Sequence, residues 1–294
     1  MPSAYTPTQQ IGAADPPLPD GPPSNAATHR ELLNNRLYLR GSSWGQLSWN
    51  GRLRITGSSN TVFAVTVGVI DAVMLIDAAS VARAYFTSAE TALDLTHVEG
   101  APANLSNDTF YYVYAWSDSA APNAVKFQIS TSPPTESGSP TVLRLWKRGQ
   151  TANYRYLGVF RTNASGVPLA MRAERGRYLY DRSAGLGDFE IGSVYSGGTL
   201  AATAVSAAAL VPPHVFRCAV TVSVLPSGDN FTAGVGVSIG GSSARIPVVI
   251  GIGADTRDVE VLLDASQEFT RTVSVYGSGT PTVQINTYAR GFEE

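Results

Sequence analysis

The sequence has little charge and almost no lysine. Charged residues make up 15% of its 294 residues, well below the roughly 25% that is typical of soluble domains. Lysine occurs only at Lys126 and Lys147, and the arginines are scattered along the chain. With a formal net charge of -2, the chain lacks the basic patch that binds a phosphate backbone. We therefore expect no nucleic-acid partner.

Cysteine and histidine are also scarce. Cys218 is the only cysteine, which excludes an intrachain disulfide. It lies in the alternating apolar run Phe216 to Val222, which predicts a small buried side chain. The three histidines, His29, His97 and His214, are far apart and lack the spacing of a zinc site. We predict no metal site and no cofactor.

No hydrophobic run is long enough to cross a membrane. The most apolar stretch, Val62 to Ile76, is interrupted by Asp71 and closed by Asp77, and it is shorter than a spanning helix. The N-terminus has neither the basic nor the apolar region of a secretory signal. We therefore expect a soluble protein that does not insert into membranes.

Proline is concentrated in the first 31 residues, where it includes Pro16, Pro17, Pro22 and Pro23. Each proline fixes φ and removes a backbone donor, which argues against a helix or a central strand. We predict an extended arm over residues 1–31 that becomes ordered against a neighbouring subunit; a disordered tail is the alternative. A capping box from Thr28 to Glu31 predicts a short helix over 29–34.

The rest of the chain consists of short alternating runs that are separated by Gly, Pro, Ser and Asp. The expected strands are 47–55 (with an Asn50-Gly51 turn), 61–70, 110–116, 125–130, 155–161, 167–171, 216–224, 232–239, 244–252, 259–264, 270–276 and 282–288. Residues 199–209 fit either a helix or a strand. This spacing predicts an all-β fold with two antiparallel β-sandwich or jelly-roll-like domains. We place these domains at 32–188 and 189–294, behind the arm.

Two patterns suggest an enzyme, and each has a simpler explanation. Gly236 to Gly240 reads Gly-Val-Ser-Ile-Gly, but a nucleophile elbow needs a following helix, and another β-run follows here. Asp255, Asp258 and Glu260, or the pair Asp181 and Asp188, could supply the two acids of a glycosidase. Residues 255–258 also fit an ordinary turn, however. We predict no catalytic residue.

Aromatic residues gather in the first domain. On alternate faces of strands, some of them must point away from the local core. Exposed tyrosine and tryptophan suit a subunit interface or stacking on a sugar ring. We expect Tyr112 and Tyr114 in the core. The candidate interface or glycan-binding aromatics are Tyr111, Trp116, Tyr154 and Tyr178.

Several segments together resemble structural proteins of tailed-bacteriophage virions, in particular tail-fibre and receptor-binding proteins. They are Leu32 to Leu39, Tyr111 to Ala115, Phe127 to Thr135, Arg155 to Thr162, and Ala209 to Pro213. The resemblance covers roughly residues 32–215. The collagen-like repeats of long fibres are absent, so a compact head or neck protein fits equally well.

The resemblance implies a non-enzymatic virion protein, made in the host cytoplasm and assembled as a homotrimer with other virion proteins. The arm and the segment with Leu33, Arg36 and Tyr38 would attach to the particle, and the C-terminal domain would project toward a host glycan or protein. A capsid decoration or head-fibre protein is the alternative within the particle. From another class, a tailspike glycan hydrolase or a carbohydrate-binding module is also open.

Overall fold

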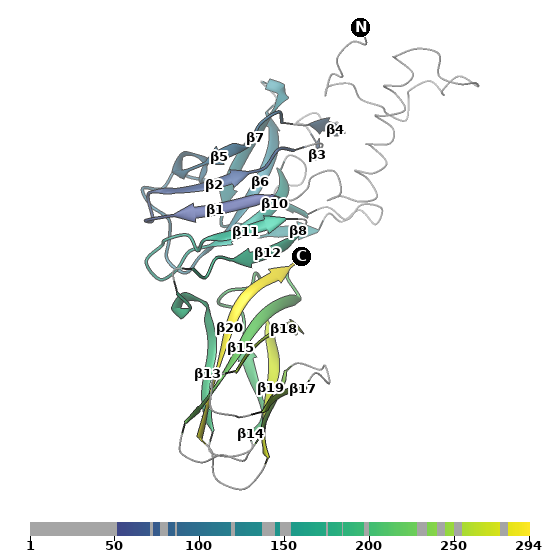
Figure 1. Ribbon diagram of the computed structural model, residues 1–294. Helices are drawn as coiled ribbons and strands as arrows, with labels where there is room; N and C mark the ends of the chain where they lie inside the picture. Colours follow the sequence, from purple (N-terminus) through teal and green to yellow (C-terminus); the bar gives the residue numbers. More distant parts are fainter. Residues whose placement is uncertain are drawn as a thin grey trace, which may run out of the picture. The chain divides into compact units, whose positions relative to one another are not determined.

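The computed structural model describes most of the chain after residue 51 (Figure 1). The described residues are 52–70, 73–76, 82–85, 87–118, 121–136, 145–147, 154–174, 176–183, 185–196, 200–227, 234–239, 245–249, 255–276 and 282–294. The predicted arm, the short helix over 29–34, the Asn50-Gly51 turn and the assembly residues lie outside these ranges. Those assembly residues are Pro16, Pro17, Pro22, Pro23, Leu33, Arg36 and Tyr38.

The all-β prediction is confirmed, and the strands of each sheet pair antiparallel. The helical elements within the described ranges are two single 3-10 turns, η1 (Leu95–His97) and η2 (Gly187–Phe189). Residues 199–209, which fit either element in the sequence, contain strand β14 (Leu200–Ser206). Nowhere in these ranges is there a helix with the length and apolarity needed to cross a bilayer.

Contacts along the chain divide it into two units between Arg175 and Gly176. The sequence placed a boundary later, near residue 188. The earlier division has a structural reason, since strand β12 (Arg177–Tyr180) pairs with the last strand, β20 (Thr282–Glu293). Residues 177–180 therefore belong to the C-terminal unit.

The N-terminal unit contains two main sheets and a hairpin. The first sheet has the order β11 (Met171–Glu174), β1 (Leu53–Gly57), β2 (Phe63–Val67) and β5 (Thr91–Leu93). The second has the order β7 (Ala121–Ser130), β6 (Phe110–Asp118), β10 (Tyr154–Arg161), β9 (Leu145–Lys147) and β8 (Pro134–Glu136). Strands β3 (Val73–Ile76) and β4 (Ala82–Tyr85) form the hairpin.

The core of this unit lies between the two sheets. Strand β2 alternates buried and half-buried residues, so one of its faces is turned inward. On that face Phe63 meets Phe160 of β10, with ring centroids 6.3 Å apart. Phe160 in turn stacks on Tyr111 of β6, at 5.4 Å and 16°. Apolar side chains from both sheets thus meet face to face, as in a β-sandwich.

The C-terminal unit also contains two sheets (Figure 1). In the first, β15 (Arg217–Ser227) lies between β18 (Asp255–Leu262) and β20, and β20 also pairs with β12 and β13 (Glu190–Ser196). The second has the order β14, β19 (Glu268–Tyr276), β16 (Gly234–Ile239) and β17 (Arg245–Val249). Alternate residues of β15 are buried, and Cys218 is among them at 1% exposed. The prediction of a buried cysteine is therefore confirmed.

A buried arginine connects the two sheets of this unit. Arg271 of β19 is 5% exposed, and its Nη1 donates a hydrogen bond of 3.0 Å to the hydroxyl of Thr287 in β20. Burial lowers the pKa of this guanidinium, because the charged form loses hydration. A buried charge is stabilised only by the hydrogen bonds that it makes, so this contact ties β19 to β20.

Gly291 permits the close approach of β12 to β20. A Cβ atom at this position would overlap the backbone carbonyl oxygen of Tyr178. The overlap involves main chain on both sides, so a side-chain rotation cannot relieve it. Glycine is therefore required at this point of the sheet.

We expect Gly291→Ala to lower the free energy of unfolding by about 3 kcal/mol or more, as strong overpacking does. The measurement is urea denaturation of the full chain, followed by circular dichroism. Gly187→Ala is the matched control, because a Cβ there meets no atom within 4 Å. Equal stability of the two variants would contradict this account of the β12–β20 contact.

Candidate functional site

Three side chains on neighbouring strands of the N-terminal unit form a candidate binding surface, which we call the aromatic platform. Trp116 of β6 lies directly opposite Tyr154 of β10, and opposite Lys126 of β7 on its other side. The Trp116 and Tyr154 rings are stacked, with centroids 5.5 Å apart and planes at 24°. The Lys126 Nζ lies 5.4 Å from the centre of the Trp116 ring, a distance at which a cation is attracted to an aromatic face.

The platform is the accessible end of a longer aromatic row. Tyr112, Tyr114 and Trp116 alternate along β6 and so share one face of the sheet. Tyr112 and Tyr114 are 3% and 0% exposed, and both pack against Tyr156. Their predicted place in the core is confirmed. Trp116 and Tyr154 are only half-buried, and Lys126 is exposed, so this end of the row can meet a ligand.

The surroundings of Tyr154 favour its neutral form over the phenolate. Partial burial raises the pKa of its hydroxyl above the ordinary value of 10.0, and the negative charge of Glu99 raises it further. The Glu99 carboxylate accepts a hydrogen bond of 2.6 Å from the Ser130 hydroxyl. The platform therefore combines two stacked aromatic rings with a neutral phenol and the ammonium group of Lys126. This combination can stack on a sugar ring and bind its hydroxyl groups.

The structure places the other two candidate aromatics in the core. Tyr111 is 2% exposed, and its hydroxyl accepts a hydrogen bond of 2.8 Å from the backbone N–H of Ser106. Tyr178 is also 2% exposed; it stacks on Phe292 at 4.5 Å and donates a hydrogen bond of 2.9 Å to Glu294. Neither ring can therefore stack on an external ligand in this structure.

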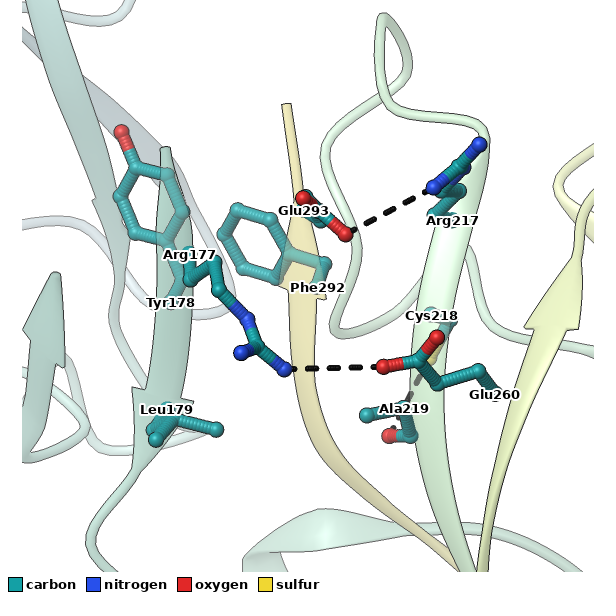
Figure 2. Close-up of a pocket in the computed structure, with 9 residues that line it drawn as sticks. All are labelled: Arg177, Tyr178, Leu179, Arg217, Cys218, Ala219, Glu260, Phe292 and Glu293. Atoms are coloured by element: carbon teal, nitrogen blue, oxygen red, sulfur yellow. Dashed lines mark hydrogen bonds and ion pairs between the residues drawn. The ribbon is translucent and has the colours of Figure 1, made fainter. Parts of the chain in front are cut away.

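A second candidate surface is a charged face of the C-terminal unit (Figure 2). Figure 2 shows Arg177 of β12 reaching Glu260 of β18, at 3.6 Å, and Arg217 of β15 reaching Glu293 of β20, at 3.8 Å. The depression that these residues line has a volume of only about 20 Å³, which is enough for about one water molecule. This surface can make polar contacts, but it does not enclose a small ligand.

Two of the acids that suggested a glycosidase, Asp258 and Glu260, pair with arginine. Asp258 forms an ion pair with Arg290 and accepts a hydrogen bond of 2.6 Å from the Thr221 hydroxyl. Glu260 forms the ion pair with Arg177. The turn suggested for 255–258 is wrong, since these residues belong to β18 and pair with β15. Charged residues on an exposed strand produce the same polar pattern as a turn.

The remaining chemical motifs are also part of ordinary β-structure. Ser238 lies inside β16, whose register places it opposite Arg245 of β17 and Thr272 of β19. It is therefore not at the strand-to-helix turn that a nucleophile elbow requires. Asp181 caps a local turn by accepting the N–H of Ser183 at 3.1 Å, and Asp188 lies in η2. Within the described part of the chain, no three His, Cys, Asp or Glu residues gather as metal ligands would.

A comparison of the sequence with known protein families and with characterised proteins found no match. Sequence pattern and site geometry therefore carry the functional inference.

Cys218 beneath the charged face provides a test of the packing there. Burial raises the pKa of its thiol to about 12, from an ordinary value of 9.0. Because the thiolate is the reactive form, we expect a thiol reagent at pH 8 to label the folded chain at least about a thousandfold more slowly than the chain in concentrated urea. The measurement is the rate of reaction with Ellman's reagent. Similar rates in the two conditions would contradict the burial of this strand.

Proposed function

We propose that this chain is a non-enzymatic structural component of a bacteriophage particle, a tail-fibre or receptor-binding protein. We also propose that the host surface is contacted by the aromatic platform of the N-terminal unit, and not by the C-terminal domain that the resemblance would project outward. The observation that carries the binding role is the half-buried Trp116–Tyr154 stack with Lys126 beside it. The assignment to a virion rests on the sequence resemblance described above.

The platform has the features of a sugar-binding surface on a rigid scaffold. Trp116 and Tyr154 project from adjacent paired strands, so their spacing is fixed by the sheet. Aromatic rings bind the apolar faces of sugars, and a polar tip at the edge of the ring binds their hydroxyl groups. Residues held in this way lose little conformational entropy on binding.

The state of the acidic residues favours binding over hydrolysis. A glycosidase needs two carboxyl groups that face one cleft from opposite sides of the sugar. Asp258 and Glu260 instead form ion pairs with Arg290 and Arg177 on a strand of the C-terminal unit. The depression beside Glu260 holds about one water molecule.

We expect Trp116→Ala and Tyr154→Ala each to weaken binding to host cells about tenfold, because an aromatic anchor at the centre of a contact is typically a hot spot. The probe is the full chain, labelled fluorescently, on a panel of bacterial cells and of their purified surface polysaccharides. Val62→Ala is the control, since Val62 is 63% exposed in the same unit and belongs to none of the platform strands.

Thermal melting of each variant separates a lost contact from a lost fold. Folded Trp116→Ala and Tyr154→Ala proteins that bind every positive cell and polysaccharide as well as the wild type would refute the platform as the binding site. Tyr154→Phe divides the contributions further, because it keeps the ring and removes only the O–H donor.

The role of the N-terminal arm has its own test. We expect a chain that lacks residues 1–31 to fold and to bind cells normally, but not to be incorporated into particles, because the arm supplies the attachment that the resemblance implies. The measurement is the amount of the truncated protein in purified particles. Normal incorporation would show that attachment uses another part of the chain.

A further inference from the structure

Edge strands of a sheet expose unpaired backbone groups, and proteins usually protect them with charge, proline or short length. The C-terminal unit follows this rule at most of its described edges. Strand β18 contains Asp255, Arg257, Asp258 and Glu260, and β17 contains Arg245 and Pro247. Strand β13 contains Glu190 at its first position. Among the edge strands that the structure describes in this unit, β14 alone has neither a charged residue nor a proline.

Strand β14 is also unusually exposed. Its sequence is Leu-Ala-Ala-Thr-Ala-Val-Ser, and the four consecutive residues from Ala201 to Ala204 are all exposed. Consecutive residues of a strand point to opposite faces, so small side chains are accessible on both faces. In the described sheet, β14 pairs with β19 alone; β13 packs near it, with Gly192 beside Val205, but no described strand is hydrogen-bonded to its other edge.

The half of β14 from Thr203 to Ser206 is regular. A register shift interrupts its pairing with β19 between Leu200 and Thr203, and the pairing continues without interruption to Ser206. Within this regular half, Ala204 lines an open groove of about 320 Å³ together with the exposed Leu262, the buried Leu263 and Phe269, and the polar residues Asp264, Glu268 and Thr270. Leu262 is 70% exposed. Beside the unprotected edge there is therefore apolar surface that remains in contact with water.

We propose that β14 pairs antiparallel with β14 of a second copy of this chain, about a twofold axis close to Ala204. The two strands then form a continuous sheet across the dimer, and the exposed Leu262 groove of each copy lies next to the interface. A twofold interface uses the same patch on both subunits.

The composition of β14 suits pairing with itself. When a strand pairs antiparallel with an identical strand about a twofold axis, the residue at the axis lies opposite itself, and like charges there are destabilising. Strand β14 has no charge to oppose. Alanine and threonine side chains also let two such strands approach without overlap, and alternative strands of this unit, such as β18, would place charged groups at the junction.

The first test is the oligomeric state of the full chain at tens of micromolar, by light scattering after size exclusion. We expect a dimer for the wild type and a monomer for Ala204→Lys, which brings two positive charges together at the axis. Ala92→Lys is the matched control, because Ala92 is an exposed alanine on the edge strand β5 of the N-terminal unit; this variant should stay dimeric.

Cross-linking provides a second, independent measurement. We expect Ala204→Cys to form a disulfide with its own copy under mild oxidation, because residues that lie opposite one another across an antiparallel pair have Cβ atoms about 5 Å apart. The buried native Cys218 gives no background in the folded chain. Ala92→Cys should stay uncross-linked under the same conditions.

The twofold pairing differs from the homotrimer that the sequence resemblance implies, and the same measurement distinguishes the two. A wild-type monomer or a trimer at these concentrations would overturn the pairing proposal. A dimer that survives Ala204→Lys in a folded protein would place the interface elsewhere. If the lysine variant does not fold, the Ala204→Cys variant decides by itself. The absence of a cross-link in that folded variant would overturn the proposal. Cell binding through the aromatic platform is measured separately, so either result leaves the other interpretable.

Discussion

Antiparallel register is the constraint on which the placement of every functional side chain in this structure depends. Trp116 lies opposite Tyr154 and Lys126 because β10, β6 and β7 pair in one particular register. A slip by one residue would exchange the two faces of a strand and would separate Trp116 from Tyr154 and Lys126. In the C-terminal unit, the same constraint fixes β20 against three partners, and Gly291 is the point at which one of them, β12, comes closest.

The sequence predicted long strands such as β6, β15 and β20, because alternation and turn residues are local signals; it missed others, among them β5, β9, β12 and β13. It also predicted that Cys218, Tyr112 and Tyr114 are buried, which the structure confirms. Two of the four aromatics that it proposed for a binding surface, Tyr111 and Tyr178, are buried instead. Alternation implies that one face of a strand meets solvent, yet residues 111–115 of β6 are all buried, so both faces of this strand are covered. The predicted domain boundary near residue 188 differs from the observed division after residue 175 for a related reason. The pairing of β12 with β20 joins segments that are far apart in the chain, and a local sequence pattern cannot reveal such a pairing.

Although the chain has few charges, several of them lie on exposed strands of the C-terminal unit. On the outer face of the C-terminal unit, arginine and carboxylate groups form pairs between strands, as Arg177 does with Glu260 and Arg217 with Glu293. Pairs of this kind, exposed to solvent, contribute little stability, but they protect β18 from pairing with other chains. Strand β14 has no such protection. An edge strand without charge or proline is therefore either covered by another strand or able to pair with another chain.

In these two proposals the N-terminal unit binds the host surface and the C-terminal unit joins two copies of the chain. Joining two copies would explain how a shallow binding site is enough for attachment to a cell. A Trp–Tyr stack that is only half-exposed contacts about one sugar ring, and a contact of that size binds weakly by itself. Association through β14 would present two platforms in one particle component. When a second contact becomes intramolecular, overall binding strengthens a hundredfold or more, on the order of 10²–10⁴, without any new interaction. The bare edge of the C-terminal unit would thus supply the affinity that the platform of the N-terminal unit cannot reach alone.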